Sequence, residues 1–446
     1  MALALACIVV AGCTDPGDEP DPQPSAGASP SATPTRTAPL SVLIYGDKRK
    51  VAAYERIAAD FEAGEGGVPV KLQVYDDAAS AADAALTGLE GGFAPDVFLL
   101  DHEYLAQFVD PPYLEPLDGP LEEQGLQFGD DFQRVALTAL SANSGLQCMP
   151  AEISPLVVYW NRGLVPRDYL EAQEVQFPDG AEGWSWEDFE AAARAVAVVD
   201  ELGPIKGAYV PSDLETVTAF VRSAGGDVVD DEVEPTRLDL ASDEAVETIR
   251  TLATFTRDPT LSPTARQLEK KPALEWFADG DLGMYIGTRV DLPRLRTEPG
   301  LRFDVVPLPG FGTGQSVSMI NGWCVNAESE NTDAAIDFIS YAVGREGATT
   351  AARSVAIVPS RVDVVNSRAF LQPNAQPRSG EVYGASVRRS APMPFAPGWP
   401  AVNRGADIVL QRVMTNPFVD IEGDRLTRRL ERLDTASEAV LSPEEE

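Results

Sequence analysis

Two places in the sequence set polar and ionisable side chains at the end of short apolar runs. Tyr45 and Asp47 close the first run, and Asp101, His102 and Glu103 follow the second. Groups at the carboxyl ends of strands are suited to binding a small polar ligand, because the loops diverge there and leave a crevice. We therefore predict that these five side chains contact a ligand. The alternative for His102 is a solvated loop residue.

The same residue types could also support catalysis or metal binding, but their spacing favours neither. His102 is the only histidine and has no cysteine nearby, whereas zinc sites need three or four such ligands. The sequence contains no G-x-S-x-G, P-loop or H-E-x-x-H motif. We expect no metal, no cofactor and no enzymatic activity. A glycoside hydrolase is the catalytic alternative, because paired carboxylates carry out that reaction and carboxylates are abundant here.

The elements that position these residues alternate between strands and helices. Strand patterns cover 41–45, 70–75, 96–100, 155–160, 282–286, 303–308 and 316–326, and helix patterns cover 51–61, 186–198, 243–255 and 333–343. Ser185 with Asp188, Ser242 and Thr332 are the predicted helix caps. Alternation at this spacing predicts an α/β fold.

The amino-terminal segment has the pattern of an exported, lipid-modified protein. An apolar run from Leu3 to Ala11 has the length of a signal-peptide core, and it is followed by Gly12 and Cys13. The ending Val-Ala-Gly-Cys resembles a bacterial lipobox, in which the cysteine takes a diacylglycerol. We predict a lipoprotein signal segment at 1–13 with Cys13 as the lipid attachment. The alternative is an exposed cysteine after an incidental apolar start.

The segment after Cys13 has a composition that does not support a folded core. Residues 14–39 contain seven prolines and almost no large apolar side chain, so they cannot bury enough surface to offset their ordering entropy. They are predicted to form a disordered tether.

The formal net charge of −35 for the whole chain would repel nucleic acid and anionic lipid headgroups. The sequence contains no run of about 18 apolar residues, which is the length needed to span a bilayer.

Six segments, taken in order, resemble the extracytoplasmic solute-binding proteins of ABC importers, in their carbohydrate-binding group (family 1 of the bacterial extracellular solute-binding proteins). The segments are APDVFLLDHEYLAQFVDPPYLEPLD, LQCMPAEISPLVVYWNRGLV, GWSWEDFEAAARAV, WFADGDLGMYIGTRVDLPRL, VVPLPG and INGWCVNAESENTDAAIDFISYAVGREGA. The first is similar to the family's Pro-Asp-Val strand and G-x-L-x-P-L turn, and the second to its G-x-P…Y-N-K-x-L crossover. The resemblance covers about residues 40 to 435.

This resemblance implies two α/β lobes of the periplasmic-binding-protein-like type II fold, with a ligand cleft between the lobes and a multi-segment hinge. The expected first lobe comprises 40–150 and about 307–360. The second comprises about 151–306 and about 361–435, and 436–446 are expected to form an acidic tail. Hinge crossings are expected near 148–154, near 306–310 and after Pro359.

Four more ligand contacts are implied by the resemblance: Glu152 in the first crossover, Arg289, and Trp323 and Trp399 as stacking platforms. Sugars present hydroxyls and apolar C–H faces, so a sugar site combines charged groups with aromatic rings. The alternatives are a hinge residue facing water for Glu152 and a surface arginine paired with Asp291 for Arg289.

Cys148 and Cys324 are the two cysteines of the predicted folded part. An even number invites a disulfide in an exported protein. The resemblance implies that their strands approach each other at the hinge side of the first lobe, and hence a Cys148–Cys324 bond. Two buried thiols are the alternative.

Together these patterns favour a monomeric, lipid-anchored substrate-binding protein on the outer face of the bacterial cytoplasmic membrane. It would capture a sugar or oligosaccharide and deliver it to the transmembrane subunits of an ABC permease, with no nucleic-acid partner. A ligand of another class, such as a polyamine, peptide or osmolyte, is the main alternative, because an acidic cleft with aromatic walls also suits a cation.

Overall fold

The computed structural model describes residues 38–65, 67–199, 205–312 and 315–442. The predicted signal segment, the lipid-attachment residue Cys13 and most of the predicted tether lie outside these residues. Within the described part, no helix combines the length and the apolar character needed to cross a bilayer.

The first sheet has six strands in the order β12-β11-β3-β1-β2, and β6 also pairs with β11. Its strands are β1 (Leu40–Tyr45), β2 (Val70–Tyr75), β3 (Val97–Asp101), β6 (Cys148–Pro155), β11 (Ser316–Val325) and β12 (Ser390–Ala391). β1 is parallel to β2 and β3, whereas β11 is antiparallel to β3 and β6. The carboxyl ends of β1 and β3 therefore meet at one edge of the sheet, as predicted.

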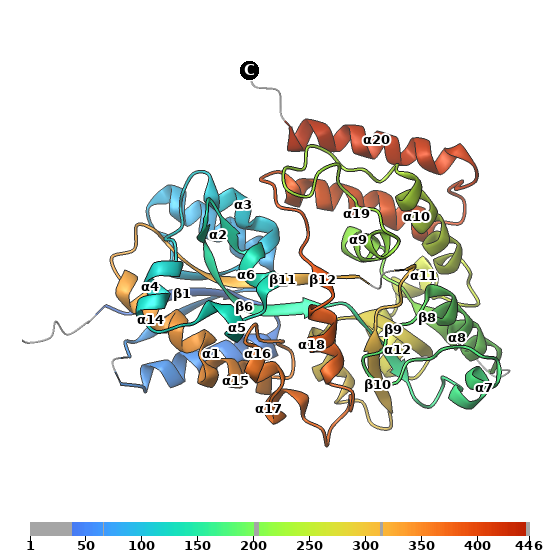
Figure 1. The fold of residues 1–446 in the computed structure, drawn as a ribbon, viewed down its shortest axis with the longest axis horizontal. Coiled ribbons are helices and arrows are strands. Elements are labelled where there is room, and N and C mark those ends of the chain that lie inside the picture. Colours follow the sequence, from blue (N-terminus) through green and yellow to red (C-terminus); the bar gives the residue numbers. More distant parts are fainter. Residues whose placement is uncertain (1–37, 66, 200–204, 313–314, 443–446) are drawn as a thin grey trace, which may run out of the picture. The chain divides into compact units, whose positions relative to one another are not determined.

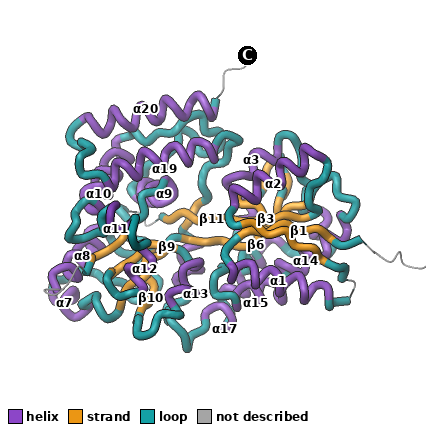
Figure 2. Tube along the Cα trace, turned by 180° about the vertical axis from the view of Figure 1, so that it is seen from behind, coloured by secondary structure: helices purple, strands orange, loops and turns teal. Residues whose placement is uncertain are grey.

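The second sheet has four strands in the order β10-β7-β9-β8. They are β7 (Val157–Asn161), β8 (Lys206–Tyr209), β9 (Leu282–Gly287) and β10 (Phe303–Pro307). β8 is parallel to β9, and β7 is antiparallel to β9 and β10. Figure 2 shows the two sheets as separate groups of strands. β4 (Ser141–Ala142) and β5 (Gly145–Leu146) form a small hairpin.

Helices cover the first sheet on both sides, with α2 and α3 on one face and α1, α14 and α15 on the other (Figure 1). Burial on both faces explains why β1 and β3 are almost continuously apolar. The helices are α1 (Lys48–Glu62), α2 (Ala78–Gly91), α3 (His102–Val109), α4 (Asp118–Glu123), α5 (Phe128–Asp131), α6 (Arg134–Ala139), α7 (Arg167–Ala172), α8 (Trp186–Val199), α9 (Leu214–Ser223), α10 (Asp243–Thr256), α11 (Ala265–Leu268), α12 (Ala273–Ala278), η1 (Arg289–Asp291), α13 (Leu292–Leu295), α14 (Thr332–Val343), α15 (Arg345–Arg353), α16 (Val362–Val365), α17 (Arg368–Leu371), α18 (Glu381–Val387), α19 (Trp399–Thr415) and α20 (Asp424–Leu441).

The last helix, α20, completes a core that also contains residues from the middle of the chain. Its Leu426 and Leu430 are fully buried in the same cluster as Leu238 and Leu240. The backbone N–H of Leu238 donates to Ser437 Oγ (2.8 Å). The backbone N–H groups of Leu240 and Ala241 donate to the carboxylate of Asp434 (3.1 and 2.9 Å). Residues nearly 200 positions apart in sequence are therefore joined by packing and by hydrogen bonds.

Two expectations about local structure need correction. α20 runs on to Leu441, so 436–441 are helical and do not form a tail. Thr332 is the first residue of α14 and does not occupy the N-cap position, which is Asn331; its hydroxyl donates to the Ser329 carbonyl (2.9 Å).

Residues 148–154, near which a hinge crossing is expected, form most of β6 and pair with β11. The chain passes from the first sheet to the second at Leu156.

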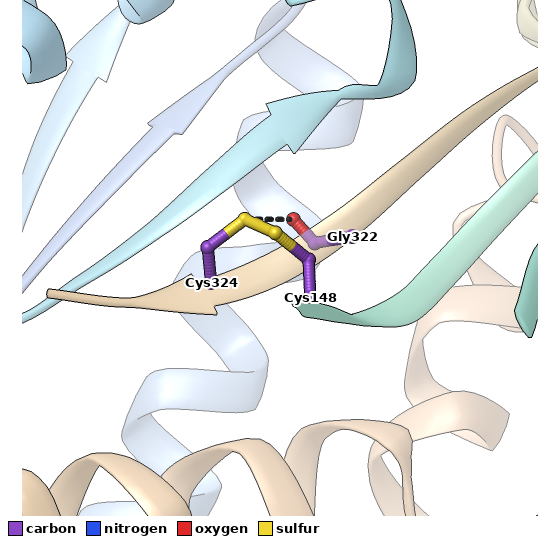
Figure 3. The surroundings of a disulfide bond; sticks show 3 residues. All are labelled: Cys148, Gly322 and Cys324. Atoms are coloured by element: carbon purple, nitrogen blue, oxygen red, sulfur yellow. Dashed lines mark hydrogen bonds between the residues drawn. A yellow bond between two sulfur atoms is a disulfide. The ribbon is translucent and has the colours of Figure 1, made fainter. Parts of the chain in front are cut away.

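A disulfide joins Cys148 on β6 to Cys324 on β11, with a Cα–Cα distance of 4.3 Å (Figure 3). The two residues are direct partners in the strand register, and both are fully buried. Gly322 lies beside the bond at an irregularity in the register. A Cβ at Gly322 would come within 2.5 Å of Leu140 and 3.0 Å of the Cys148 Cβ. Only glycine therefore fits this approach of the two strands.

Candidate functional site

The end of β1 leads into a buried polar network. Lys50, on the first turn of α1, forms an ion pair with Glu152 on β6, and the side chain of Glu152 is 2% exposed. Asn321 Nδ2 donates to Glu152 Oε1 (2.6 Å), and the Tyr45 hydroxyl donates to Asn321 Oδ1. Lys50 Nζ also lies 4.5 Å from the centre of the Tyr45 ring. Tyr45 and Glu152 are thus occupied by internal partners, which makes them a scaffold of the site and not free ligand contacts.

Asp47, the other predicted residue at this strand end, is exposed and caps α1. Its Oδ1 accepts from the backbone N–H groups of Arg49 (3.0 Å) and Lys50 (2.8 Å). Such a cap satisfies backbone donors that a helix start leaves unpaired. This role accounts for Asp47 without a ligand.

The end of β3 brings three of the predicted residues together at the start of α3. Asp101 caps α3 by accepting from the Glu103 N–H (2.9 Å), and burial raises the pKa of Asp101 to about 7. His102 is buried, its ring lies 6.0 Å from that of Phe395, and burial lowers the pKa of His102 to about 4. His102 is therefore a neutral, buried residue at pH 7 and not a solvated one.

Glu103 connects α3 to α19, a helix that follows β12 in sequence. Its Oε1 accepts from Asn403 Nδ2 (2.8 Å). Burial raises the pKa of Glu103. The hydrogen bond from Asn403 lowers this pKa, but the effect of burial is larger. One turn further along α19, Asp407 Oδ1 accepts from the backbone N–H of Leu214 at the start of α9 (2.7 Å). The helices α3, α9 and α19 are thus tied together by polar contacts.

The start of α9 adds two acidic residues to this meeting point. Asp213 caps α9 by accepting from the Thr216 N–H (2.8 Å). Burial raises the pKa of Glu215 well above its usual range, and the charges of Asp213, Asp101, Glu103 and Asp407 raise it further. We call Asp101, Glu103, Asp213, Glu215 and Asp407 the acidic cluster. Burial also raises the pKa of Asp407 to about 6.

A cavity of about 840 Å³ lies at the end of β8 and along α19. Its wall includes Ser212 and Ile408, the sequence neighbours of Asp213 and Asp407, which do not line it themselves. Tyr209, the last residue of β8, lines the cavity and stacks on Tyr285, with ring planes 12° apart and centres 5.8 Å apart. The rest of the lining is mixed. Its polar residues are Ser212, Thr256, Ser262, Glu269, Gln411, Arg412, Thr415 and Asn416, and its other apolar residues are Val210, Pro263, Ala265, Leu268, Pro272, Ala273 and Pro417. An aromatic wall with scattered polar groups in this size range is typical of small-molecule sites.

Two predicted stacking platforms are wrong, because the structure buries both rings in cores. Trp323 is 1% exposed and makes edge-on contacts with Tyr54 (5.1 Å) and Phe338 (5.6 Å) on the helices behind the sheet. Trp399, at the first position of α19, is fully buried. Neither ring presents a free face to a ligand.

Arg289 is also misassigned as a ligand contact. It is 1% exposed, and its guanidinium lies over the ring of Phe370 (3.8 Å) and near that of Tyr383 (4.9 Å). Burial lowers the pKa of Arg289 to about 10. Asp291, the partner in the alternative interpretation, instead accepts from the Thr288 N–H (3.2 Å) and the Tyr285 hydroxyl (3.3 Å). Arg289 therefore packs against the core that contains Phe370 and Tyr383 and stabilises it.

The sequence interpretation missed Tyr209, Glu215 and Asp407. A usable signal existed for Glu215: an Asp cap and an acidic first turn at the start of α9, the same pattern that singled out Asp101. Asp407 lies inside a helix, where no local pattern marks it. In the part of the chain that the structure describes, no group of three or more His, Cys, Asp or Glu side chains is arranged to hold a metal ion.

Comparisons with known proteins give a family and a fold. A model of the bacterial extracellular solute-binding protein family matches residues 56–376. An uncharacterized lipoprotein in the oleD 5′ region of Streptomyces antibioticus is 27% identical over 194 residues, which is 44% of this chain and 38% of that protein. The match therefore spans well under half of this relative's length.

Two solved structures share the fold over nearly their whole length. The ABC substrate-binding protein Lmo0181 of Listeria monocytogenes, in complex with cycloalternan, has a TM-score of 0.75 at 19% identity, covering 90% of this chain and 99% of that one. UgpB of Mycobacterium tuberculosis, in complex with glycerophosphocholine, has a TM-score of 0.73 at 18% identity, covering 90% and 98%. These matches confirm the predicted two-lobed α/β fold, and the proteins matched are substrate-binding proteins.

Proposed function

Because the chain belongs to the bacterial extracellular solute-binding proteins, we propose that it captures a carbohydrate and delivers it to an ABC permease. The observation that carries the choice of a carbohydrate is the cavity at the end of β8. It combines the ring of Tyr209 with hydroxyl and amide groups, and a sugar needs both an apolar surface for its C–H face and partners for its hydroxyls. The cycloalternan complex of the Listeria relative supports the same class of ligand.

Release and capture would depend on movement of the lobes. A ligand shifts an open–closed equilibrium only if it contacts both sides of the cleft. In this proposal the α9–α19 side supplies the cavity and α3 supplies Asp101 and Glu103. The proposed lobe boundaries follow the two sheets, with the chain changing sheets at Leu156 and between β10 and β11.

The ligand class is tested by a thermal-shift screen of mono- and oligosaccharides, followed by titration of Tyr209 variants with the sugar that binds best. A ligand at about 100 times its Kd should stabilise the folded state by about 2.7 kcal/mol. Tyr209→Ala should weaken binding about 10-fold or more, because the stacking ring is lost, whereas Tyr209→Phe should keep it.

The matched control for these variants is Tyr169→Ala, on α7, which removes a tyrosine that is 56% exposed and does not line the cavity. It should leave the affinity unchanged. Failure of every sugar to stabilise the protein would contradict the carbohydrate assignment. Equal affinities of wild type and Tyr209→Ala would remove the ring from the site.

We also propose that Cys13 carries the lipid that holds the protein at the outer face of the membrane, which is supported by the lipobox-like ending and by the lipoprotein relative. Cys13→Ala should move the protein from the membrane fraction to the soluble fraction, because no acyl chain could then be attached. Membrane association that persists in Cys13→Ala would exclude this anchor. Ala11→Ser, which keeps a small residue before the cysteine, serves as the control that stays membrane-bound.

A further inference from the structure

Glu215, a member of the acidic cluster, lacks a hydrogen-bond partner at one of its carboxyl oxygens within the described part of the chain. Its Oε1 atom is buried and has no hydrogen-bond partner among the described residues. A buried carboxyl oxygen without a partner is costly, and such groups in native structures call for an explanation. A donor brought by a ligand would supply the missing partner.

Four other carboxylates act on Glu215 electrostatically. Asp213 lies at the start of its own helix, Asp101 and Glu103 at the start of α3, and Asp407 on α19. The contacts Glu103–Asn403 and Asp407–Leu214 hold these elements together. Carboxylates from three elements therefore lie within electrostatic reach of Glu215.

Few positive groups balance this charge. The charge of Arg404 acts on Glu103, but its side chain is exposed to solvent. The charge of Lys50 acts on Asp101, yet its ammonium is already paired with Glu152. The amino-terminal ends of α3 and α9 favour negative charge, but Asp101 and Asp213 already cap them. A neutral hydroxyl would satisfy Glu215 Oε1 but would leave the excess charge in place.

We propose that the acidic cluster binds an ammonium group of the ligand, with Glu215 as its direct partner. The chemistry fits an amino sugar or a polyamine. The inference rests on the proposed function, because it concerns a part of the same ligand.

Binding of a cation should be linked to pH. Asp101, Glu103, Glu215 and Asp407 all have raised pKa values, Asp101 to about 7 and Asp407 to about 6. The cluster thus holds protons near neutral pH that an ammonium would displace. Affinity for spermidine, which stays charged throughout, should rise between about pH 5.5 and about pH 7.5, with release of protons to the buffer.

The test compares amines with their neutral counterparts on the full chain at equal ionic strength. The pairs are glucosamine with glucose and the chitosan disaccharide with cellobiose, and spermidine serves as a cation without a sugar. At least one amine should raise the melting temperature more than its neutral partner does. Glu215→Gln should weaken binding of that amine about 10- to 100-fold, because a charge-assisted hydrogen bond is lost.

The control variant is Glu346→Gln, which removes the same charge from the first turn of α15, where the side chain is exposed. It should leave amine binding unchanged. Two outcomes overturn the inference: no amine stabilises the wild type beyond its neutral partner, or Glu215→Gln binds the amine as tightly as the wild type does. Binding of neutral sugars alone leaves the carbohydrate function standing without the cation site. A response to spermidine alone supports the cation site and contradicts the carbohydrate function.

Discussion

Replacing Lys50 by methionine should lower the free energy of unfolding by about 3–5 kcal/mol, because it leaves the carboxylate of Glu152 buried without its counter-ion. Both side chains are nearly inaccessible to water, at 9% and 2% exposure. Methionine keeps the length of the lysine stem, so packing changes little. Urea denaturation at pH 7 would show the loss as a lower midpoint with an unchanged m-value.

The double variant Lys50→Met/Glu152→Gln is the informative partner of this experiment. It removes both charges and retains an amide that can accept from Asn321, so it should recover most of the stability lost in the single variant. Arg56→Met is the matched control on the same helix. It breaks an ion pair with Asp60 in which the arginine side chain is 70% exposed, and it should leave the urea midpoint nearly unchanged, because solvent screens exposed ion pairs. A double variant as unstable as Lys50→Met would show that the unpaired charge of Glu152 does not cause the loss of stability in Lys50→Met.

Removing the disulfide by Cys148→Ala/Cys324→Ala should cost about 4–5 kcal/mol in the chain-entropy model. The bond closes a loop over a sequence separation of 176 residues, and its loss gives the unfolded chain many more conformations. Unfolding monitored by circular dichroism should also show a larger m-value for the double variant, because its unfolded state exposes more surface.

Two measurements make this result interpretable. Mass spectrometry under non-reducing conditions should show the wild type lighter by two hydrogens than the reduced chain. A mild reductant should leave the native wild type intact, because both sulfur-bearing residues are fully buried. A double variant within about 1 kcal/mol of the wild type would mean that the bond adds little to stability.

The regular elements of the fold could be predicted wherever an apolar run was long and clearly bounded. The pattern at 70–75 coincides with β2, and the pattern at 186–198 with α8 to within one residue. The residue pattern does not predict β6, because its sequence CMPAEISP contains two prolines and prolines are depleted in strands; only the family resemblance implies a strand at Cys148. Its pairing with β11 depends on a partner more than 160 residues away, which no local pattern contains.

The candidate site was predictable only where a strand end was visible. Asp101 and Glu103 could be predicted, because the apolar run of β3 shows where that strand ends. Both lie in the acidic cluster. Tyr209 ends a strand of four residues, too short to stand out. The family resemblance of its segment implies Trp323 as a ligand contact, but the strand turns this ring toward Tyr54 on α1 and Phe338 on α14. Residue type alone does not reveal which side of a strand meets solvent.

The hydrogen bonds between α20 and residues 238–241 bear on the order in which the protein can mature. Before α20 has been translated, the backbone N–H groups of Leu238, Leu240 and Ala241 cannot donate to Ser437 and Asp434. The buried Leu238 and Leu240 also lack the helix that packs against them. That half of the molecule therefore cannot reach its final form until α20 has been translated. A premature stop that deletes α20 would leave an open apolar surface for chaperones and proteases to recognise.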